Sequence, residues 1–238
     1  MMTKINFEDN FEIYLFTEQN DSMSSSKLNE FLSFLKFHKV NLPYKFSFVS
    51  TSASLIPEMT LNQNILIDFT PDSLTESKEV QFQDFLKDQN NRALESLYHK
   101  VSLPHEFPAN SSAQMKKISS LIKSLLSDGQ FIFLEEPEVD LEAATLELFI
   151  SALKMHIKNH RMNVFIYSKN LAMWMPHSHK MVERTRDFSF LVSPVSRNYL
   201  WDEEREIFYA PADKNSVPVL NGLKFSRPKD KNRKKSAA

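Results

Sequence analysis

The chain has 238 residues, of which 42% are hydrophobic and 25% charged, enough for one large globular domain or two small ones. It contains two glycines, Gly129 and Gly222, and no cysteine, which excludes an intact glycine-rich phosphate loop, disulfides, thiolate catalysis and cysteine-based zinc sites. The formal net charge of -1 is unevenly spread, because residues 224–238 hold seven Lys or Arg and one Asp, a net of +6, and residues 1–223 therefore carry -7. We expect a folded domain over residues 1–223 and a basic, disordered tail over residues 224–238.

Short apolar and polar stretches alternate in the amino-terminal part of the chain. Residues 5–16 are rich in Phe, Ile and Tyr and predict one or two strands, whereas the polar residues 17–26 predict a loop. Residues 27–39 space their apolar side chains three and four positions apart and predict a helix, and residues 45–50 predict a strand. A further helix is expected to begin near Thr60.

A mixed, mostly polar stretch follows. Within it we expect one helix from about Glu79 to His99 and a second from Gln114 to Ser127, after a cap region at residues 110–113. Since both helices lie between predicted strands, residues 71–127 are expected to form a helical insert.

The clearest pattern lies in the middle of the chain. Residues 131–134 (FIFL) are apolar throughout, as in a strand buried on both faces, and residues 163–168 (NVFIYS) form a similar run. Residues 141–159, between them, predict a helix with one apolar face, which makes a βαβ unit. Residues 184–209 predict further short strands. The expected fold class is α/β, a mainly parallel sheet flanked by helices.

Four segments follow one another in an order known from a protein family. They are SASLIPEMTLNQNILID (52–68), NSSAQMKK (110–117), FIFLEEPEVDLEAATLELF (131–149) and FIYSKN (165–170). Their order and spacing resemble the ATP-binding subunits of ABC transporters, closest in pattern to the lipoprotein-release, macrolide-export and cell-division members. The resemblance implies an ABC-ATPase-like fold. Its amino-terminal β-subdomain would be reduced, because too little sequence precedes the phosphate loop.

The resemblance also implies roles by position. Glu135 stands where the family has its Mg²⁺-associated aspartate, and Glu136 stands where it has its general base. Lys169 occupies the place of the switch histidine, and Thr51 that of the Q-loop glutamine. Of these hydrolytic positions only Glu136 is unaltered, so we expect them to be relics.

The phosphate-binding segments are altered as well. Ser111 and Gln114 of the signature segment remain, whereas both signature glycines are replaced. The phosphate loop holds no glycine, and a methionine stands in place of the phosphate-binding lysine, so the loop has neither an open amide nest nor a charge to set against phosphate. The degenerate positions are Thr17, Asn20, Ser22, Met23, Ser24 and Ser25.

Other candidate sites have simpler interpretations. The two adjacent glutamates could be solvated carboxylates at a strand end. His156 and His160 have the i, i+4 spacing of zinc sites, yet no His–Glu pair accompanies them, and charged histidine is favoured near a helix carboxyl terminus. His177 and His179 are similarly unaccompanied. We expect no metal site and no cofactor.

Together these features predict a catalytically inactive ABC-type ATPase paralogue, not an enzyme, that acts as a structural or regulatory subunit of a membrane-associated, transporter-like complex. The implied partners are a permease-like membrane subunit and an active ATPase subunit. No apolar run is long enough for a signal peptide or a membrane span, so we expect a cytoplasmic protein, peripheral to the inner (plasma) membrane. Residues 224–238 could contact anionic lipid.

Two alternatives stay open. The chain could be an active ATP-binding subunit of an ABC transporter with an atypical phosphate loop. It could instead be a nucleic-acid-associated protein of the wider ABC superfamily, which the basic tail favours. We expect no nucleic acid as a partner, because the body of the chain is acidic and shows no aromatic platform with interleaved basic residues.

Overall fold

The computed structural model divides the chain into two compact units, residues 1–194 and 195–238, and each is described by itself. The expected domain limit at residue 223 and the expected tail lie outside the described residues. The described residues are 5, 7, 11–17, 26–40, 43, 45–69, 75–88, 91–127, 129–185, 187, 189–195, 200–202 and 207–209.

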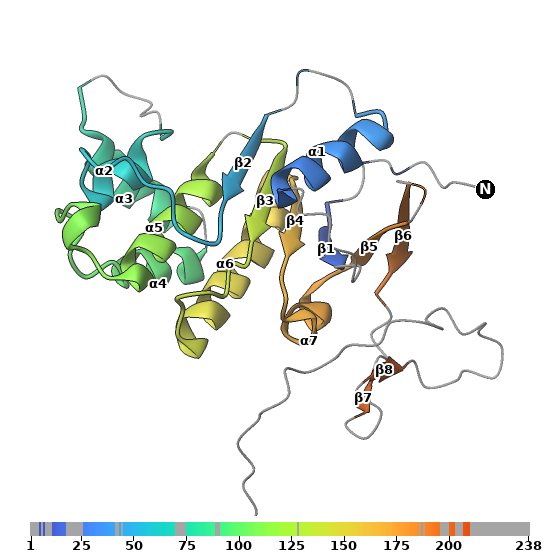
Figure 1. The fold of residues 1–238 in the computed structure, drawn as a ribbon. Coiled ribbons are helices and arrows are strands. Elements are labelled where there is room, and N and C mark those ends of the chain that lie inside the picture. The colour runs from blue at the N-terminus through green and yellow to red at the C-terminus, as the bar shows by residue number, and fades with distance from the viewer. Residues whose placement is uncertain are drawn as a thin grey trace, which may run out of the picture. The chain divides into compact units, whose positions relative to one another are not determined.

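A six-stranded sheet in the order β2-β3-β4-β1-β5-β6 forms the centre of the first unit (Figure 1). All neighbouring strands are parallel except β5 and β6, which are antiparallel. The mainly parallel α/β fold is therefore confirmed. The strands are β1 (Ile13–Thr17), β2 (Phe46–Val49), β3 (Phe131–Glu135), β4 (Asn163–Tyr167), β5 (Lys180–Arg184) and β6 (Phe190–Pro194).

Seven α-helices and two short 3-10 helices are described in the same unit. Figure 1 shows α2, α3, α4 and α5 gathered beyond the β2 end of the sheet, while α1 lies across the strands. The helices are α1 (Lys27–Phe37), α2 (Leu61–Leu66), α3 (Lys78–Asp88), α4 (Arg92–His99), η1 (Pro108–Asn110), α5 (Ala113–Leu126), α6 (Ala143–His160), α7 (Leu171–Trp174) and η2 (Met175–His177). In the second unit, β7 (Leu200–Asp202) pairs with β8 (Ile207–Tyr209).

The helix expected over residues 79–99 is wrong, because two helices, α3 and α4, occupy this stretch. Asn91 explains the break. Its side-chain oxygen accepts the amide of Leu94 at 3.1 Å and so caps α4, while its amide nitrogen donates to the carbonyl of Ala152 at 3.1 Å. A tertiary contact with α6 therefore decides where α4 begins.

Aromatic side chains fill the interface between α1 and the sheet. Phe31 of α1 stacks on Phe133 of β3, with ring centroids 4.9 Å apart and an interplanar angle of 2°. Tyr14 of β1 stacks on Phe165 of β4 at 4.9 Å and 18°. All four are buried, and aromatic pairs of this kind contribute about 0.5–1.5 kcal/mol beyond the area that they bury. The layer holds α1 against the middle of the sheet.

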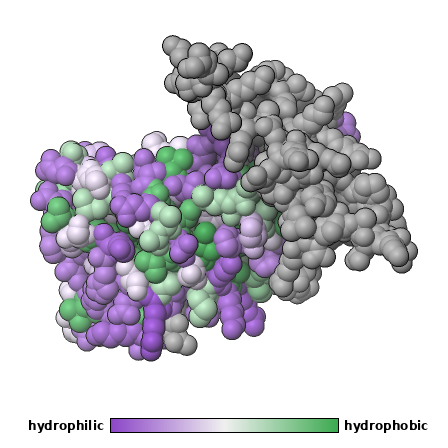
Figure 2. Space-filling model, turned by 90° about the horizontal axis from the view of Figure 1, so that it is seen from below, coloured by the Kyte–Doolittle hydropathy of each residue, from purple (hydrophilic) through white to green (hydrophobic). Residues whose placement is uncertain are grey.

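The helices and the surface of the described residues can be compared with what a membrane requires. Among these residues no helix is both long and apolar enough to cross a membrane. Figure 2 shows hydrophobic residues in separate groups among hydrophilic ones on the face that it draws.

His156 is a titratable group inside the core. It is 3% exposed on α6, and its ring stacks on that of His160 with centroids 4.2 Å apart. Its Nε2 has no hydrogen-bond partner among the described residues. Burial, and then the neighbouring His160, lower the pKa of His156 to about 3.

We predict that His156→Leu makes the protein less sensitive to acid. The folded pKa of His156 lies below the unfolded value of about 6.5, so the unfolded state binds the extra proton first. His156 therefore lowers the free energy of unfolding as pH falls below about 6.5, by up to about 1.4 kcal/mol per pH unit until its folded pKa is reached. Urea unfolding between about pH 4.5 and 7.5 measures this slope. The exposed His105 provides the control variant His105→Leu, and an equal slope in both variants would contradict the assignment.

Candidate functional site

The carboxyl ends of the parallel strands bring together segments that are far apart in sequence. The chain leaves β2, β3 and β4 at one edge of the sheet, and ligands of open α/β sheets bind at this edge. Thr51 follows β2, Glu136 follows β3 and Lys169 follows β4. The resemblance placed these three residues at the Q-loop, general-base and switch positions, and Glu136 is in direct contact with both of the others.

Glu136 lies at the centre of this cluster. Its Oε1 accepts the ammonium of Lys169 at 2.7 Å, and its Oε2 accepts the hydroxyl of Thr51 at 3.2 Å. The Glu136 side chain is 10% exposed and that of Lys169 is 72% exposed. Both carboxylate oxygens are thus engaged within the chain, and the ion pair is partly shielded from water on the Glu136 side only. We call Thr51, Glu136 and Lys169 the Glu136 cluster.

The backbone of Glu136 is also unusual. Its φ is 44°, in the left-handed region, which costs about 1–2 kcal/mol for a residue with a Cβ. Its amide donates to the carbonyl of Tyr167 at 2.7 Å, and its own carbonyl accepts the amide of Val139 at 3.1 Å. Contacts with β4 on one side and a tight turn on the other hold this conformation and aim the carboxylate at Lys169.

Lys117, which was not among the residues expected from the sequence, contacts the cluster from the interior. It is fully buried on α5, and its ammonium donates to the carbonyls of Ser50 at 3.1 Å and Thr51 at 2.9 Å. Burial lowers the pKa of Lys117, whereas the carboxylates of the acidic turn 135–140 oppose that shift. The available signal was a lysine on the apolar face of α5, one turn before Leu121.

Glu138 fixes the acidic turn to the chain after β4. One carboxylate oxygen accepts the hydroxyl of Ser168, and the other accepts the indole nitrogen of Trp174 at 2.9 Å. Ser168 also accepts the amide of Asn170 at 2.9 Å. These bonds position the neighbours of Lys169. No local sequence pattern indicates these bonds, because Glu138 follows β3 and Trp174 follows β4, and the two residues come together only when these strands pair.

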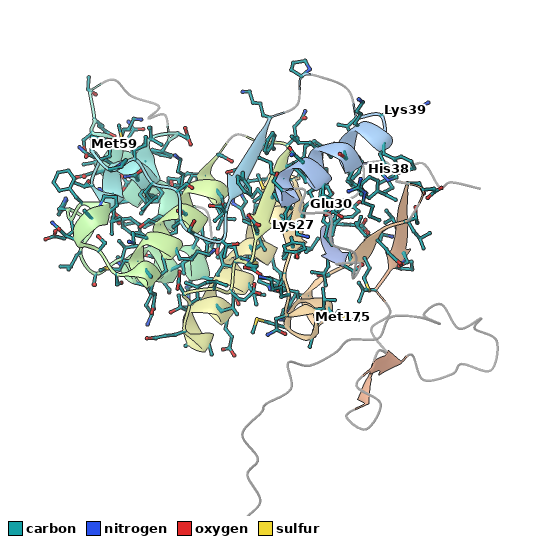
Figure 3. All side chains as sticks on the ribbon, in the orientation of Figure 1. Lys27, Glu30, His38, Lys39, Met59 and Met175 are labelled. Atoms are coloured by element: carbon teal, nitrogen blue, oxygen red, sulfur yellow. The ribbon has the colours of Figure 1, made fainter. Side chains whose placement is uncertain are left out.

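Glu135 ends β3, half-buried, opposite Tyr167 in the strand register. The ammonium of Lys27 lies over the Tyr167 ring, 4.2 Å from its centroid, and makes a cation–π contact. Figure 3 shows Lys27 at the end of α1 nearest the middle of the sheet, with His38 and Lys39 at the other end. A second basic side chain therefore lies at the same edge as the Glu136 cluster.

The two remaining signature residues make other contacts. The hydroxyl of Ser111 donates to the carbonyl of Phe107 at 2.9 Å, and the amide of Gln114 donates to the hydroxyl of Thr145 at 3.4 Å. Ser112, which the resemblance places at a signature glycine, caps α5 by accepting a hydrogen bond from the amide of Met115 at 3.2 Å. The side chains of this segment serve the fold of the chain itself.

Of the phosphate-loop positions, only Thr17 is among the described residues. It is the last residue of β1, is 3% exposed, and donates its hydroxyl to the carbonyl of Val182 at 3.3 Å. Asn20, Ser22, Met23, Ser24 and Ser25 lie outside the described residues. Thr17 thus contributes to the pairing of β1 with β5.

The remaining histidine candidates also have structural contacts. His179 accepts the amide of Ile13 on its Nδ1 at 2.9 Å, and the Nδ1 of His177 lies 3.0 Å from the ammonium of Lys154. His156 stacks on His160, as described above. Over the residues for which side chains are placed, no three His, Asp or Glu come close enough to hold a metal ion.

Comparison with known proteins identifies the fold. No family model matches the sequence, and no curated protein does either. Solved structures do match. A putative metal-chelate type ABC transporter in an inward-facing conformation aligns with a TM-score of 0.54 at 17% identity, over 79% of this chain and 75% of that one. The chain has the fold of an ABC ATP-binding cassette.

Two further structures agree with this cassette fold. The dimeric ATP-binding cassette MJ0796, in a post-hydrolysis state with ADP and Pi, aligns with a TM-score of 0.53 at 12% identity, over 81% of this chain and 88% of that one. An ATP-binding subunit of an ABC transporter aligns with a TM-score of 0.52 at 15% identity, over 72% and 74%. The resemblance found in the sequence is thus confirmed at the level of the cassette fold.

We predict that Lys169 and Glu136 stabilise each other more than an exposed ion pair does. A double-mutant cycle with Lys169→Met and Glu136→Gln should give a coupling of about 0.5–1 kcal/mol in urea unfolding, above the ~0.3–0.5 kcal/mol of exposed helix pairs, since one partner is largely withdrawn from water. The exposed pair of Lys87 and Asp84, 3.3 Å apart on α3, provides the matched control cycle. A coupling no larger than that of the control would show that the ion pair does not organise the cluster.

Proposed function

We propose that the chain is a catalytically inactive ATP-binding cassette that works as a structural or regulatory subunit of a membrane-associated, transporter-like complex. The observation that carries this proposal is the Glu136 cluster. A general base must be free to accept a proton from water. Here each oxygen of Glu136 already accepts a hydrogen bond from a residue that replaces a hydrolytic group of the family, Lys169 or Thr51.

The signature segment supports a scaffolding role over a catalytic role in trans. In the family that the sequence resembles, this segment faces the nucleotide of the partner cassette. In this chain Ser111 and Gln114 hydrogen-bond within the subunit, and Ser112 adds a side chain where a glycine would let the backbone approach closely. A subunit of this kind would contribute shape and contacts to an assembly with an active ATPase subunit.

The helical insert supports docking to a permease-like membrane subunit. Three large apolar side chains of this region are exposed, Val80 by 51%, Leu103 by 50% and Phe107 by 45%. Leu103 and Phe107 flank a loop whose carbonyls at Pro104 and Glu106 accept amides of α2. Exposed apolar groups on a well-anchored loop are suited to contact with another protein.

We predict that the purified protein binds Mg-ATP no more tightly than millimolar, because the loop lacks a phosphate-binding lysine and glycines. Isothermal titration calorimetry measures the affinity. Met23→Lys together with Ser22→Gly serves as the comparison, since it restores two of the missing groups. A micromolar dissociation constant for the unaltered chain would contradict the proposal and favour an active subunit with an atypical phosphate loop.

The basic segment 224–238 supports the peripheral membrane location. Its net charge of +6 suits anionic lipid headgroups, because each basic residue near the surface contributes about 1 kcal/mol to binding.

We predict that changing Lys229, Lys231, Lys234 and Lys235 to Gln lowers membrane recovery in cell fractionation. Recovery of the unaltered chain should also fall as salt is raised.

The matched comparison for this experiment is Leu103→Ser with Phe107→Ser, which leaves the tail charge intact. Loss of membrane recovery in this variant alone would assign recruitment to the folded unit. Recovery that is changed neither by the four lysine substitutions nor by salt would show that the basic segment is not an electrostatic anchor. Salt-dependent binding of the chain to DNA would favour the nucleic-acid-associated alternative.

A further inference from the structure

The acidic turn after β3 poses a problem of charge compensation. Residues 135–142 include five carboxylates, Glu135, Glu136, Glu138, Asp140 and Glu142. Like charges this close together repel one another, and the repulsion increases where burial excludes water. Glu136 is itself 8% exposed. The turn therefore needs positive charge from elsewhere in the chain.

Two lysines supply this charge from opposite sides. Lys169 approaches Glu136 from the solvent, as its exposed side chain shows. Lys117 approaches from the interior, where its charge interacts with Glu138, Asp140, Glu136 and Glu135. A fully buried ammonium is costly unless it is hydrogen-bonded and paired. The carbonyls of Ser50 and Thr51 accept hydrogen bonds from it, and the negative charge of the acidic turn favours its charged form without a direct ion pair.

The contacts of Lys117 continue to the Glu136 cluster without a gap. The ammonium of Lys117 donates to the carbonyl of Thr51 at 2.9 Å, and the hydroxyl of Thr51 donates to Glu136 Oε2. Glu136 Oε1 in turn accepts a hydrogen bond from the ammonium of Lys169. Lys117 belongs to α5, which packs against α2 and α4. A continuous series of polar contacts thus runs from the helical insert to the exposed ammonium of Lys169.

We propose that Lys117 is a positioning residue for Glu136: from inside the protein it fixes the segment at Ser50 and Thr51, and this segment in turn holds the Glu136 carboxylate against Lys169. The arrangement links the helical insert to the relic hydrolytic site. A partner that shifts α5 will therefore alter the Lys169–Glu136 ion pair. The inference goes beyond the proposed function, because it rests on these contacts and holds whether or not nucleotide binds.

The test reads the state of Lys169 while changing Lys117, which does not touch it. The side-chain nuclear magnetic resonance signals of Lys169 report whether its ammonium is paired, and Glu136→Ala provides the reference signal for the broken pair. Lys117→Met should move the Lys169 signals at least half of the way to that reference. Lys117→Arg, which retains the charge and the donors, should restore most of the original position.

Two further variants separate positioning from a general loss of structure. Lys116→Met changes the half-exposed neighbour on the same helix and should leave the Lys169 signals in place. Thr51→Val removes the middle contact with little change of volume and should move them as Lys117→Met does. If Lys117→Met fails to fold, Thr51→Val and Lys117→Arg decide the matter. Lys169 signals that stay at the original position in folded Lys117→Met, or in Thr51→Val, would overturn the proposal.

Discussion

The aromatic layer between α1 and the sheet is the contact on which the rest of the first unit depends. Phe31, Phe34, Phe133 and Phe165 are all buried in it, and pairs among them are stacked, tilted or edge-to-face at centroid distances between 4.9 and 5.6 Å. These rings come from α1, β3 and β4, so one layer joins the helix after the phosphate-loop region to the strands that precede the acidic turn and Lys169. Flat side chains at native packing density leave little room for the strands to slide. The segments after β2, β3 and β4 consequently meet at a fixed edge.

The contacts of the carboxylates at this edge with other residues of the chain limit which ligands they can bind. In a hydrolytic cassette the acidic residues would face a metal ion and a nucleotide, as the resemblance implies. Here Lys169 and Thr51 bind the two oxygens of Glu136, and Lys117 holds the carbonyls of Ser50 and Thr51 from the interior. Glu138 is likewise occupied by Ser168 and Trp174. The same carboxylates that would bind a ligand in the family thus hold three loops of this chain together. These contacts are the basis of the proposed scaffolding role.

The pattern of agreement and error between sequence and structure follows from the range of the interactions involved. The βαβ unit of β3, α6 and β4 could be predicted, since two buried apolar runs and a helical repeat are local signals. The start of α2 at Thr60 could be predicted for the same reason, and its capping box is present. The single helix over residues 79–99 was wrong because the amide of Asn91 reaches Ala152, a contact that no local propensity reports. The roles of His177 and His179 were hidden for the same reason, since their partners lie on α6 and β1.

The sequence by itself determined the α/β class and the order of the segments that resemble an ATP-binding cassette, because composition, hydrophobic period and the order of short segments do not depend on which strands become neighbours. Only the tertiary structure decided that Thr51, Glu136 and Lys169 form one cluster with Lys117 beneath it. Residues separated by up to 85 positions come into contact there, because the strand order places β2, β3 and β4 side by side with their carboxyl ends at one edge. The charged residues can be listed from the sequence, but the strand order determines which of them lie close enough to form ion pairs and hydrogen bonds.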